Sequence, residues 1–289
     1  IVNISSTNGV NTYYPICMEY DASKELKPLI KELTTFSHQN GKNITEVFDD
    51  FLLYIIYGFD CTFKKIDGWN YTPEHTQAFG RMFEEWVRLM DKVLRHRAWY
   101  DAFGDIYMEL ITSKMRQQGN GQFFTPHTIC DFMAKVTINE GEHAGKVSDC
   151  ACGSGRCLLA ANAISPGNYY VGQDIDRTCC LMTVCNFLIH GMVGEVIWGD
   201  ALNPANFHGA WKTNEMLKYG TPSVRQIGMH ESQGYLSAVS AILGKEDKKD
   251  EEKPKPKVVA PIAAVKKSPK ACKSNGGYEQ MSLFDGFWK

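Results

Sequence analysis

The chain has 289 residues, of which 44% are hydrophobic and 12% aromatic, enough for one medium-sized core with an accessory part. It has no apolar run near the roughly 20 residues of a membrane-spanning helix, and its start lacks the basic-then-apolar order of a signal peptide. We therefore expect a globular, cytoplasmic protein.

The net charge of −2 conceals two regions of opposite charge. Residues 245–273 carry ten Lys and five acidic residues, whereas residues 1–244 carry twenty basic and twenty-six acidic ones. Because the body has an excess of acidic residues, it is not expected to clamp nucleic acid over a broad basic surface. Contact with DNA would need a local patch, the tail or another subunit.

The N-terminal part is predicted to be helical. Residues 1–21 are rich in Ser, Asn and Thr without a helical period, which predicts a flexible arm. Within residues 22–119, apolar residues recur at steps of three and four and predict helices over 23–36, 44–57, 73–97 and 103–118. Thr72 followed by Pro73 is typical of a helix start.

From Lys146 the pattern changes to short apolar strands that alternate with helices. Strands are predicted over 146–150, 169–174 and 195–198, and helices over 155–163 and 176–190. This alternation predicts an α/β fold with a parallel sheet and crossover helices, in a domain spanning residues 120–244. After residue 202 only one more strand (223–230) and a short helix (235–243) are indicated, so we expect an incomplete sheet.

The ten cysteines contain no C-x-x-C pair. Six of them lie in the apolar central region, where we expect buried thiols in preference to metal ligands or disulfides. These six are Cys150, Cys152, Cys157, Cys179, Cys180 and Cys185.

The segment "SDCACGSGRCLLAA" (148–161) places Gly153 and Gly155 directly after the first predicted strand. A glycine turn here lets the backbone approach a ligand and points the free N–H groups of the next helix at it, although G-x-G alone also fits an ordinary tight turn. Three acidic residues at successive strand ends, Asp149, Asp174 and Asp200, favour the ligand, because these ends share one crevice. We expect a nucleotide-like molecule there.

Four segments in order carry a resemblance to a known family: "GQFFTPHTICDFMA" (121–134), the glycine segment, "YYVGQDIDRTCCLMTVCNFLIHG" (169–191) and "GDAL" (199–202). They resemble the cofactor motifs of N6-adenine DNA methyltransferases, most closely the modification subunits of type I restriction systems. The resemblance implies a Rossmann-like domain after a helical part, and S-adenosylmethionine as cofactor.

By position, the resemblance implies ten cofactor-binding residues. They are Phe124, Thr125 and Pro126 at the methionine end, Asp149, Gly153 and Gly155 in the loop, Asp174 and Ile175 at the ribose, and Asp200 and Ala201 at the adenine. The "FFTP" stretch also fits an ordinary strand-to-helix turn.

One expected motif is missing. Family enzymes extrude the target adenine and seat its amine with a [D/N/S]-P-P-[Y/F/W] tetrapeptide at the end of the fourth strand. None of the eleven prolines in this chain is adjacent to another. "NPAN" (203–206) could act as a substitute or form a turn after the third strand, and the catalytic residues remain unassigned.

The C-terminal region ends in a short motif. Residues 245–277, rich in Lys, Glu and Pro, predict a disordered linker, which leads to "YEQMSLFDGFWK" (278–289). "QMSLF" resembles the peptide by which bacterial DNA-acting proteins bind the replicative sliding clamp, with Gln280 orienting the peptide and Leu283 and Phe284 filling an apolar pocket. The alternative is that these apolar residues pack on the body of the same chain.

Three functions fit these observations. The first is a DNA adenine methyltransferase that acts alone or with a specificity or complementing subunit. The second is a catalytically inactive cofactor-binding protein that is recruited to DNA through the sliding clamp. The third is a helical scaffold whose glycine turn is only structural.

Overall fold

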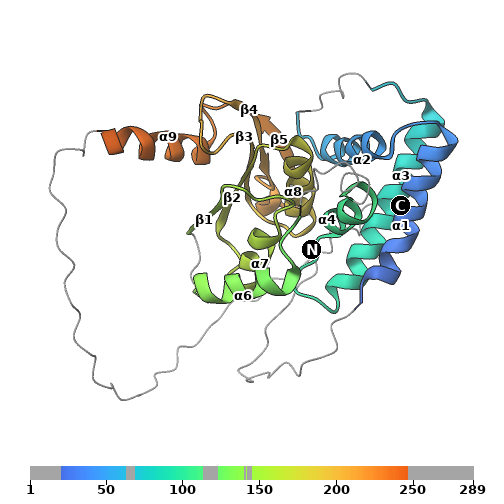
Figure 1. Ribbon diagram of the computed structural model, residues 1–289, viewed down its shortest axis with the longest axis horizontal. Helices are drawn as coiled ribbons and strands as arrows, with labels where there is room; N and C mark the ends of the chain where they lie inside the picture. Colours follow the sequence, from blue (N-terminus) through green and yellow to red (C-terminus); the bar gives the residue numbers. More distant parts are fainter. Residues whose placement is uncertain (1–20, 63–68, 113–122, 140, 142–144, 247–289) are drawn as a thin grey trace, which may run out of the picture.

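The computed structural model describes residues 21–62, 69–112, 123–139, 141 and 145–246. In these residues a helical part packs against an α/β part (Figure 1). None of the described helices is both long and apolar enough to cross a bilayer. The predicted arm, except Asp21, and the clamp motif lie outside the described residues, as does the linker except for residues 245 and 246, which close the last helix.

Three long helices form the first part: α1 (Ser23–Gln39), α2 (Ile44–Gly58) and α3 (Pro73–Leu94). Their apolar residues, spaced by three and four, face a common core. The start of α3 is as predicted, since the Thr72 hydroxyl accepts a hydrogen bond from the His75 N–H and Pro73 opens the helix. The helix ends three residues before the predicted Arg97, because the chain turns after Val93 and Leu94, where the apolar pattern stops.

The predicted helix over 103–118 is only partly correct. A five-residue α-helix, α4 (Ala102–Ile106), is capped by the Asp101 carboxylate and continues as a π-helical turn, η1 (Tyr107–Thr112). The following residues, 113–118, lie outside the described part. Wide π-helical turns are frequent at functional sites, and Tyr107 begins this one.

The sheet has five strands in the order β1-β2-β3-β4-β5: β1 (Lys146–Asp149), β2 (Tyr169–Asp174), β3 (Gly194–Gly199), β4 (Phe207–Thr213) and β5 (Val224–Ile227). The first three are parallel as predicted, but β4 and β5 are antiparallel. Strand β4 was not predicted. The connection of residues 200–206 is too short for a crossover, so β4 must return alongside β3.

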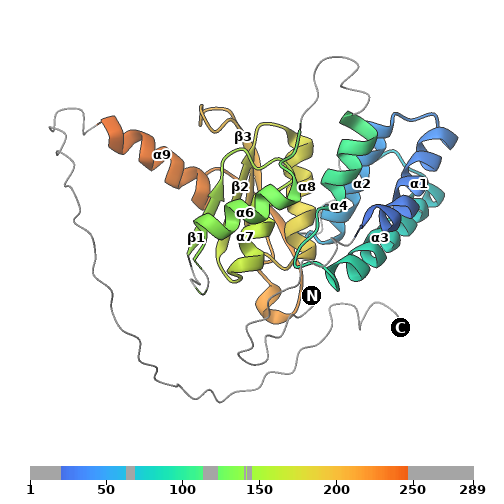
Figure 2. The same ribbon diagram turned by 60° about the horizontal axis from the view of Figure 1, so that its bottom comes forward.

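Helix α8 (Arg177–Ile189) lies between the sheet and α2 (Figure 1). Every residue from Cys179 to Leu188 is buried, which explains why its sequence is apolar on all sides. Helices α6 (His127–Thr137) and α7 (Arg156–Ile164) pack together at the end of the domain near β1 (Figure 2). Helix α9 (Gln233–Glu246) covers part of the other face, with its start held by the buried Glu195 carboxylate.

The cysteine prediction holds for four residues of the six. Cys152, Cys179, Cys180 and Cys185 are buried, and Cys157 is partly buried. The prediction is wrong for Cys150, which is exposed because it follows the last residue of β1 at the start of the glycine loop.

Candidate functional site

The glycine loop joins β1 to α7. Gly153 and Gly155 have φ angles of +55° and +87°, in the left-handed region, and Gly155 is the N-cap of α7. A Cβ atom on Gly153 would lie 2.9 Å from the Cδ1 atom of the Phe124 ring. Glycine is therefore required at residue 153 both by its backbone conformation and by the ring that covers it.

A cavity of about 230 Å³ opens between the loop, the "FFTP" stretch and the end of β2. Its walls include Phe124, Thr125, Asp149, Gly153 and Asp174. Five of the ten residues implied by the resemblance thus come together from three separate segments. Gly155, the N-cap of α7, belongs to the same loop but does not line the cavity.

Two carboxylates face this cavity. Asp174 accepts hydrogen bonds from the N–H of Gly153 at 2.8 Å and of Asp176 at 2.9 Å, one on each oxygen. Each oxygen keeps a second lone pair for a ligand hydroxyl. Asp149 accepts from the N–H of Ala151 at 3.1 Å, and burial raises the pKa of its carboxyl. The pair can therefore accept hydrogen bonds from a polar ligand at the cavity.

Besides Gly155, four implied residues do not line this cavity. Asp200 and Ala201 line a separate space of about 10 Å³, and Asp200 accepts a hydrogen bond from the N–H of Leu202. The Ile175 side chain is exposed, and Pro126 faces a different cavity as the N-cap of α6. The roles of these four residues in cofactor binding remain predictions. "NPAN" forms a turn after β3, closed by a hydrogen bond from the Asn206 N–H to the Asn203 carbonyl.

The aromatic residues that line the cavity are Phe123 and Phe124, and Tyr107 contacts Phe124 without lining the cavity itself. The Tyr107 ring lies 5.5 Å from the Phe124 ring, centroid to centroid. Burial and the nearby carboxylates, Asp176 foremost, raise the pKa of Tyr107 to about 12, so its hydroxyl stays protonated at neutral pH. No sequence pattern indicated Tyr107, because its position depends on the π-helical turn.

A buried ionic network lies beneath the loop. The fully buried carboxylate of Asp101 accepts hydrogen bonds from Ser154 Oγ (2.6 Å), Arg156 Nε (2.6 Å) and Asn186 Nδ2 (2.7 Å). Burial alone would raise the pKa of Asp101, but these partners, Arg156 first, hold it below its usual value. Residue Asp101 of the helical part thus fixes two residues of the glycine segment. Sequence reasoning missed it, because no local pattern links residues so far apart.

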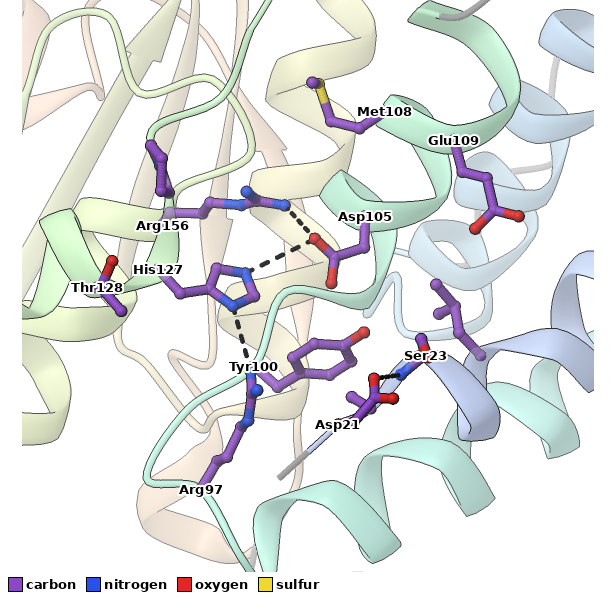
Figure 3. Close-up of a pocket in the computed structure, with 13 residues that line it drawn as sticks. Asp21, Ser23, Arg97, Tyr100, Asp105, Met108, Glu109, His127, Thr128 and Arg156 are labelled. Carbon is purple, nitrogen blue, oxygen red and sulfur yellow. Dashed lines mark hydrogen bonds and ion pairs between the residues drawn. The ribbon is translucent and has the colours of Figure 1, made fainter. Parts of the chain in front are cut away.

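A second cavity, of about 610 Å³, lies between the helical part and α6 and α7 (Figure 3). Arg97 Nη1 lies 3.2 Å from His127 Nδ1, His127 Nε2 lies 3.7 Å from Asp105, and Arg156 Nη2 donates to Asp105 at 2.6 Å. Burial lowers the pKa of His127 despite the neighbouring carboxylate. These contacts cross the cavity and connect α6 and α7 to the helical part, with Arg156 and Asp105 as the ion pair.

Residues 98–218 match the family model described as N-6 DNA Methylase. The match begins before α4 and ends after β4, so it contains the cavity, the glycine loop and the Asp101 network. This segment, less than half of the chain, is therefore similar to the N-6 DNA methylases. The resemblance of the four motifs to the type I modification subunits is confirmed.

Two relatives of the methylase segment are known by name. The type I restriction enzyme MpnII methylase subunit of Mycoplasma pneumoniae is 35% identical over 100 residues, which are 32% of this chain and 18% of that protein. The crystal structure of a type I restriction-modification methyltransferase subunit from Streptococcus thermophilus is 24% identical, covers 64% of this chain and 42% of that one, and superposes with a TM-score of 0.34. The chain spans less than a fifth of the first relative and less than half of the second.

Proposed function

We propose that this chain binds S-adenosylmethionine in the cavity of about 230 Å³ and forms the cofactor-binding part of an N6-adenine DNA methyltransferase. The proposal rests mainly on the hydrogen bond that the Asp174 carboxylate accepts from the Gly153 N–H. A carboxylate at the end of β2 orders the backbone of the glycine loop while its remaining lone pairs face the cavity. The bound cofactor would supply an activated methyl group.

The residues present fit this cofactor. Asp174 accepts ribose hydroxyls, the N-terminal N–H groups of α7 face the loop, and the Phe124 ring covers apolar atoms of the ligand. The cavity is smaller than the roughly 300–1,000 Å³ typical of ligand sites. We infer that part of the cofactor extends over the exposed Ile175 side chain, toward Asp200 and Ala201.

The 289 residues lack the tetrapeptide that the resemblance implies for methyl transfer. Without adjacent prolines the chain has no tetrapeptide to seat the target amine. We infer that DNA and a specificity or complementing subunit complete the site. In the alternative function, the chain binds the cofactor without catalysis and reaches DNA through the sliding clamp.

Cofactor binding is the first test. Equilibrium dialysis of the purified chain with labelled S-adenosylmethionine should detect binding, and Asp174→Ala should weaken it about 10- to 100-fold, the effect of losing a charged hydrogen-bond acceptor. Asp91→Ala, an exposed residue of α3 paired with Arg95, is the matched control. Thermal unfolding shows whether each variant is folded. If the folded Asp174→Ala variant binds as tightly as the unmodified chain, the cavity is not the site and the scaffold function is favoured.

Methylation is the second test. The chain should be expressed in a bacterium without adenine methylation, with and without its genomic neighbours, and N6-methyladenine mapped by single-molecule sequencing. Methylation only with a neighbour is the expected result. Methylation by the chain alone would identify an unrecognised catalytic segment, and no methylation from a chain that binds the cofactor would favour the inactive alternative.

The clamp motif carries a separate proposal. Residues 278–289 follow a linker of about thirty residues. If they bind the clamp, they would raise the local concentration of the chain at DNA, although the body of the chain is not basic. A tail peptide should retain the purified clamp, and the double variant Leu283→Ala and Phe284→Ala should lose it. Retention unchanged by the double variant would contradict clamp binding through Leu283 and Phe284.

A further inference from the structure

Two thiols lie close together beside the candidate cofactor cavity. Cys130 belongs to the first turn of α6, and Cys157 is the second residue of α7. Their Sγ atoms are 3.7 Å apart, where the two helices pack against each other (Figure 2). The sulfur atoms of a disulfide are about 2 Å apart, so these two need to approach by about 1.7 Å to form one.

The two thiols differ in how a reagent can reach them. Cys157 is partly exposed and lines the cavity, whereas Cys130 is completely buried. The hydrogen bond from the Cys130 thiol lowers the pKa of the Cys157 thiol, and the N–H groups at the start of α7 also favour a thiolate there. The same hydrogen bond and burial raise the pKa of Cys130. Cys157 is therefore the more nucleophilic sulfur of the pair.

The other two thiols of the cavity are less suited to reaction. Cys152 and Cys179 also line it, but both side chains are buried, and burial raises the pKa of each thiol. Since the thiolate is the reactive form of cysteine, a small oxidant that enters the cavity reacts first at Cys157.

The pair connects two of the segments that form the cavity. The "FFTP" stretch, which supplies Phe124 and Thr125, leads into α6, and the glycine loop, which supplies Gly153, leads into α7. The Cys130 Sγ atom also lies 3.7 Å from the Thr125 carbonyl oxygen. A covalent bond between Cys130 and Cys157 would therefore fix the distance between these two segments.

We propose that Cys130 and Cys157 are a redox-active pair, which a hydroperoxide converts into a disulfide. The Cys157 thiolate attacks one oxygen of hydrogen peroxide, and the O–O bond breaks. The departing hydroxide takes up the proton that the thiol released, which leaves a sulfenic acid and water. The Cys130 thiol then attacks the Cys157 sulfur, and the S–O bond breaks as a second water leaves with the Cys130 proton. The pair loses two electrons, and the peroxide is reduced to water.

The disulfide also acts on the candidate cofactor site, a consequence that rests on the proposed function. The link would draw the "FFTP" stretch and the glycine loop together around a cavity of only about 230 Å³. We therefore expect the oxidised chain to bind S-adenosylmethionine about tenfold more weakly than the reduced chain. Dithiothreitol, which reduces disulfides, should restore the binding.

Peptide mapping of the full chain tests the pair. The purified chain is treated with hydrogen peroxide, its remaining thiols are blocked with N-ethylmaleimide, and its peptides are analysed by mass spectrometry without reduction. We expect a disulfide between Cys130 and Cys157. Cys150→Ser, which removes an exposed thiol of the glycine loop, is the control and should form the same disulfide. A disulfide from Cys157 to any other cysteine, or Cys130 and Cys157 both still alkylated when Cys150 is oxidised, would overturn the proposal.

Two variants separate the roles of the thiols. In Cys130→Ser, the reaction should stop at the Cys157 sulfenic acid, which dimedone labels. In Cys157→Ser, the buried Cys130 should remain a thiol. Thermal unfolding shows whether each variant is folded. Dimedone labelling of Cys130 in the folded Cys157→Ser variant, at the rate found for Cys157, would contradict the order of the two steps.

Binding of S-adenosylmethionine, measured before and after oxidation, tests the effect on the cavity. The tenfold loss should occur in the unmodified chain and in Cys150→Ser, but not in Cys157→Ser. Unchanged affinity of a chain that carries the disulfide would overturn the link between the pair and the cavity. Absence of binding in the reduced chain would instead contradict the proposed function, and peptide mapping would still decide whether the thiol pair exists.

Discussion

Two features require glycine at residue 153. Its backbone is left-handed, and the Phe124 ring occupies the space that a Cβ atom would need. Gly153→Ala should lower the free energy of unfolding by about 1–2 kcal/mol through backbone strain and should also weaken cofactor binding, because the ring must move. Gly167→Ala is the matched control, since Gly167 also has a positive φ but nothing lies within 4 Å of its added Cβ. Calorimetric titration with S-adenosylmethionine compares the two. Equal cofactor affinity in both variants would mean that the Phe124 contact is unimportant for binding.

His190 makes stability depend on pH. Burial lowers its pKa from 6.5 to about 4, and the neutral ring accepts a hydrogen bond from the Tyr100 N–H while its other nitrogen lies 2.8 Å from the Asn186 carbonyl. Between pH 6.5 and 4 the unfolded chain binds a proton that the folded chain does not. The free energy of unfolding should therefore fall as pH decreases through this window, by about 1.4 kcal/mol per pH unit and about 3 kcal/mol in total.

Urea unfolding at pH 7, 6, 5 and 4 measures this dependence. His190→Gln should be less stable at pH 7 but should lose less stability on acidification. His208→Gln, which replaces an exposed side chain, is the control and should follow the unmodified chain. A variant at His190 with an unchanged pH slope would show that another group titrates in this range.

At the scale of elements, α2 and α6 use apolar residues differently. Phe51 of α2 is fully buried against the rings of Phe79 and Phe103, whereas Phe132 of α6 is 64% exposed. Phe51→Ala should cost about 3–5 kcal/mol of unfolding free energy, and Phe132→Ala less than about 0.5 kcal/mol in the isolated chain. Chemical denaturation measures both. A large cost for Phe132→Ala would mean that another part of the chain covers this face of α6.

At the scale of the whole molecule, one core joins the helical part to the sheet. The same buried cluster contains Leu29 of α1, Val184 of α8 and Val196 of β3, and the Asp101–Arg156 ion pair crosses between the parts. Calorimetry should therefore record one unfolding transition whose calorimetric and van't Hoff enthalpies agree.

The Asp101 variant tests the same coupling. Asp101→Ala leaves the buried Arg156 without one of its two carboxylate partners, and it should lower stability by about 3–5 kcal/mol without splitting the transition. Lys42→Ala, which removes a partly exposed ion pair with Glu46 on α2, should change stability by less than about 1 kcal/mol. Two separated transitions in either protein would show that the helical part and the sheet unfold independently.

The sequence alone was sufficient for elements whose residues act locally. Neighbouring residues determine the periods of α1 and α2, the Thr72 cap, the boundaries of β2 and the glycine turn. The four ordered motifs were sufficient for the resemblance to N-6 DNA methylases. Only the tertiary structure decided the rest. The direction of β4 depends on its pairing with β3, Asp101 reaches the loop from 53 residues away, and Asp200 turns to a different cavity from Asp174. The exposed apolar face of α6 has the pattern of a buried helix, because periodicity specifies which residues share a face and leaves open what covers that face.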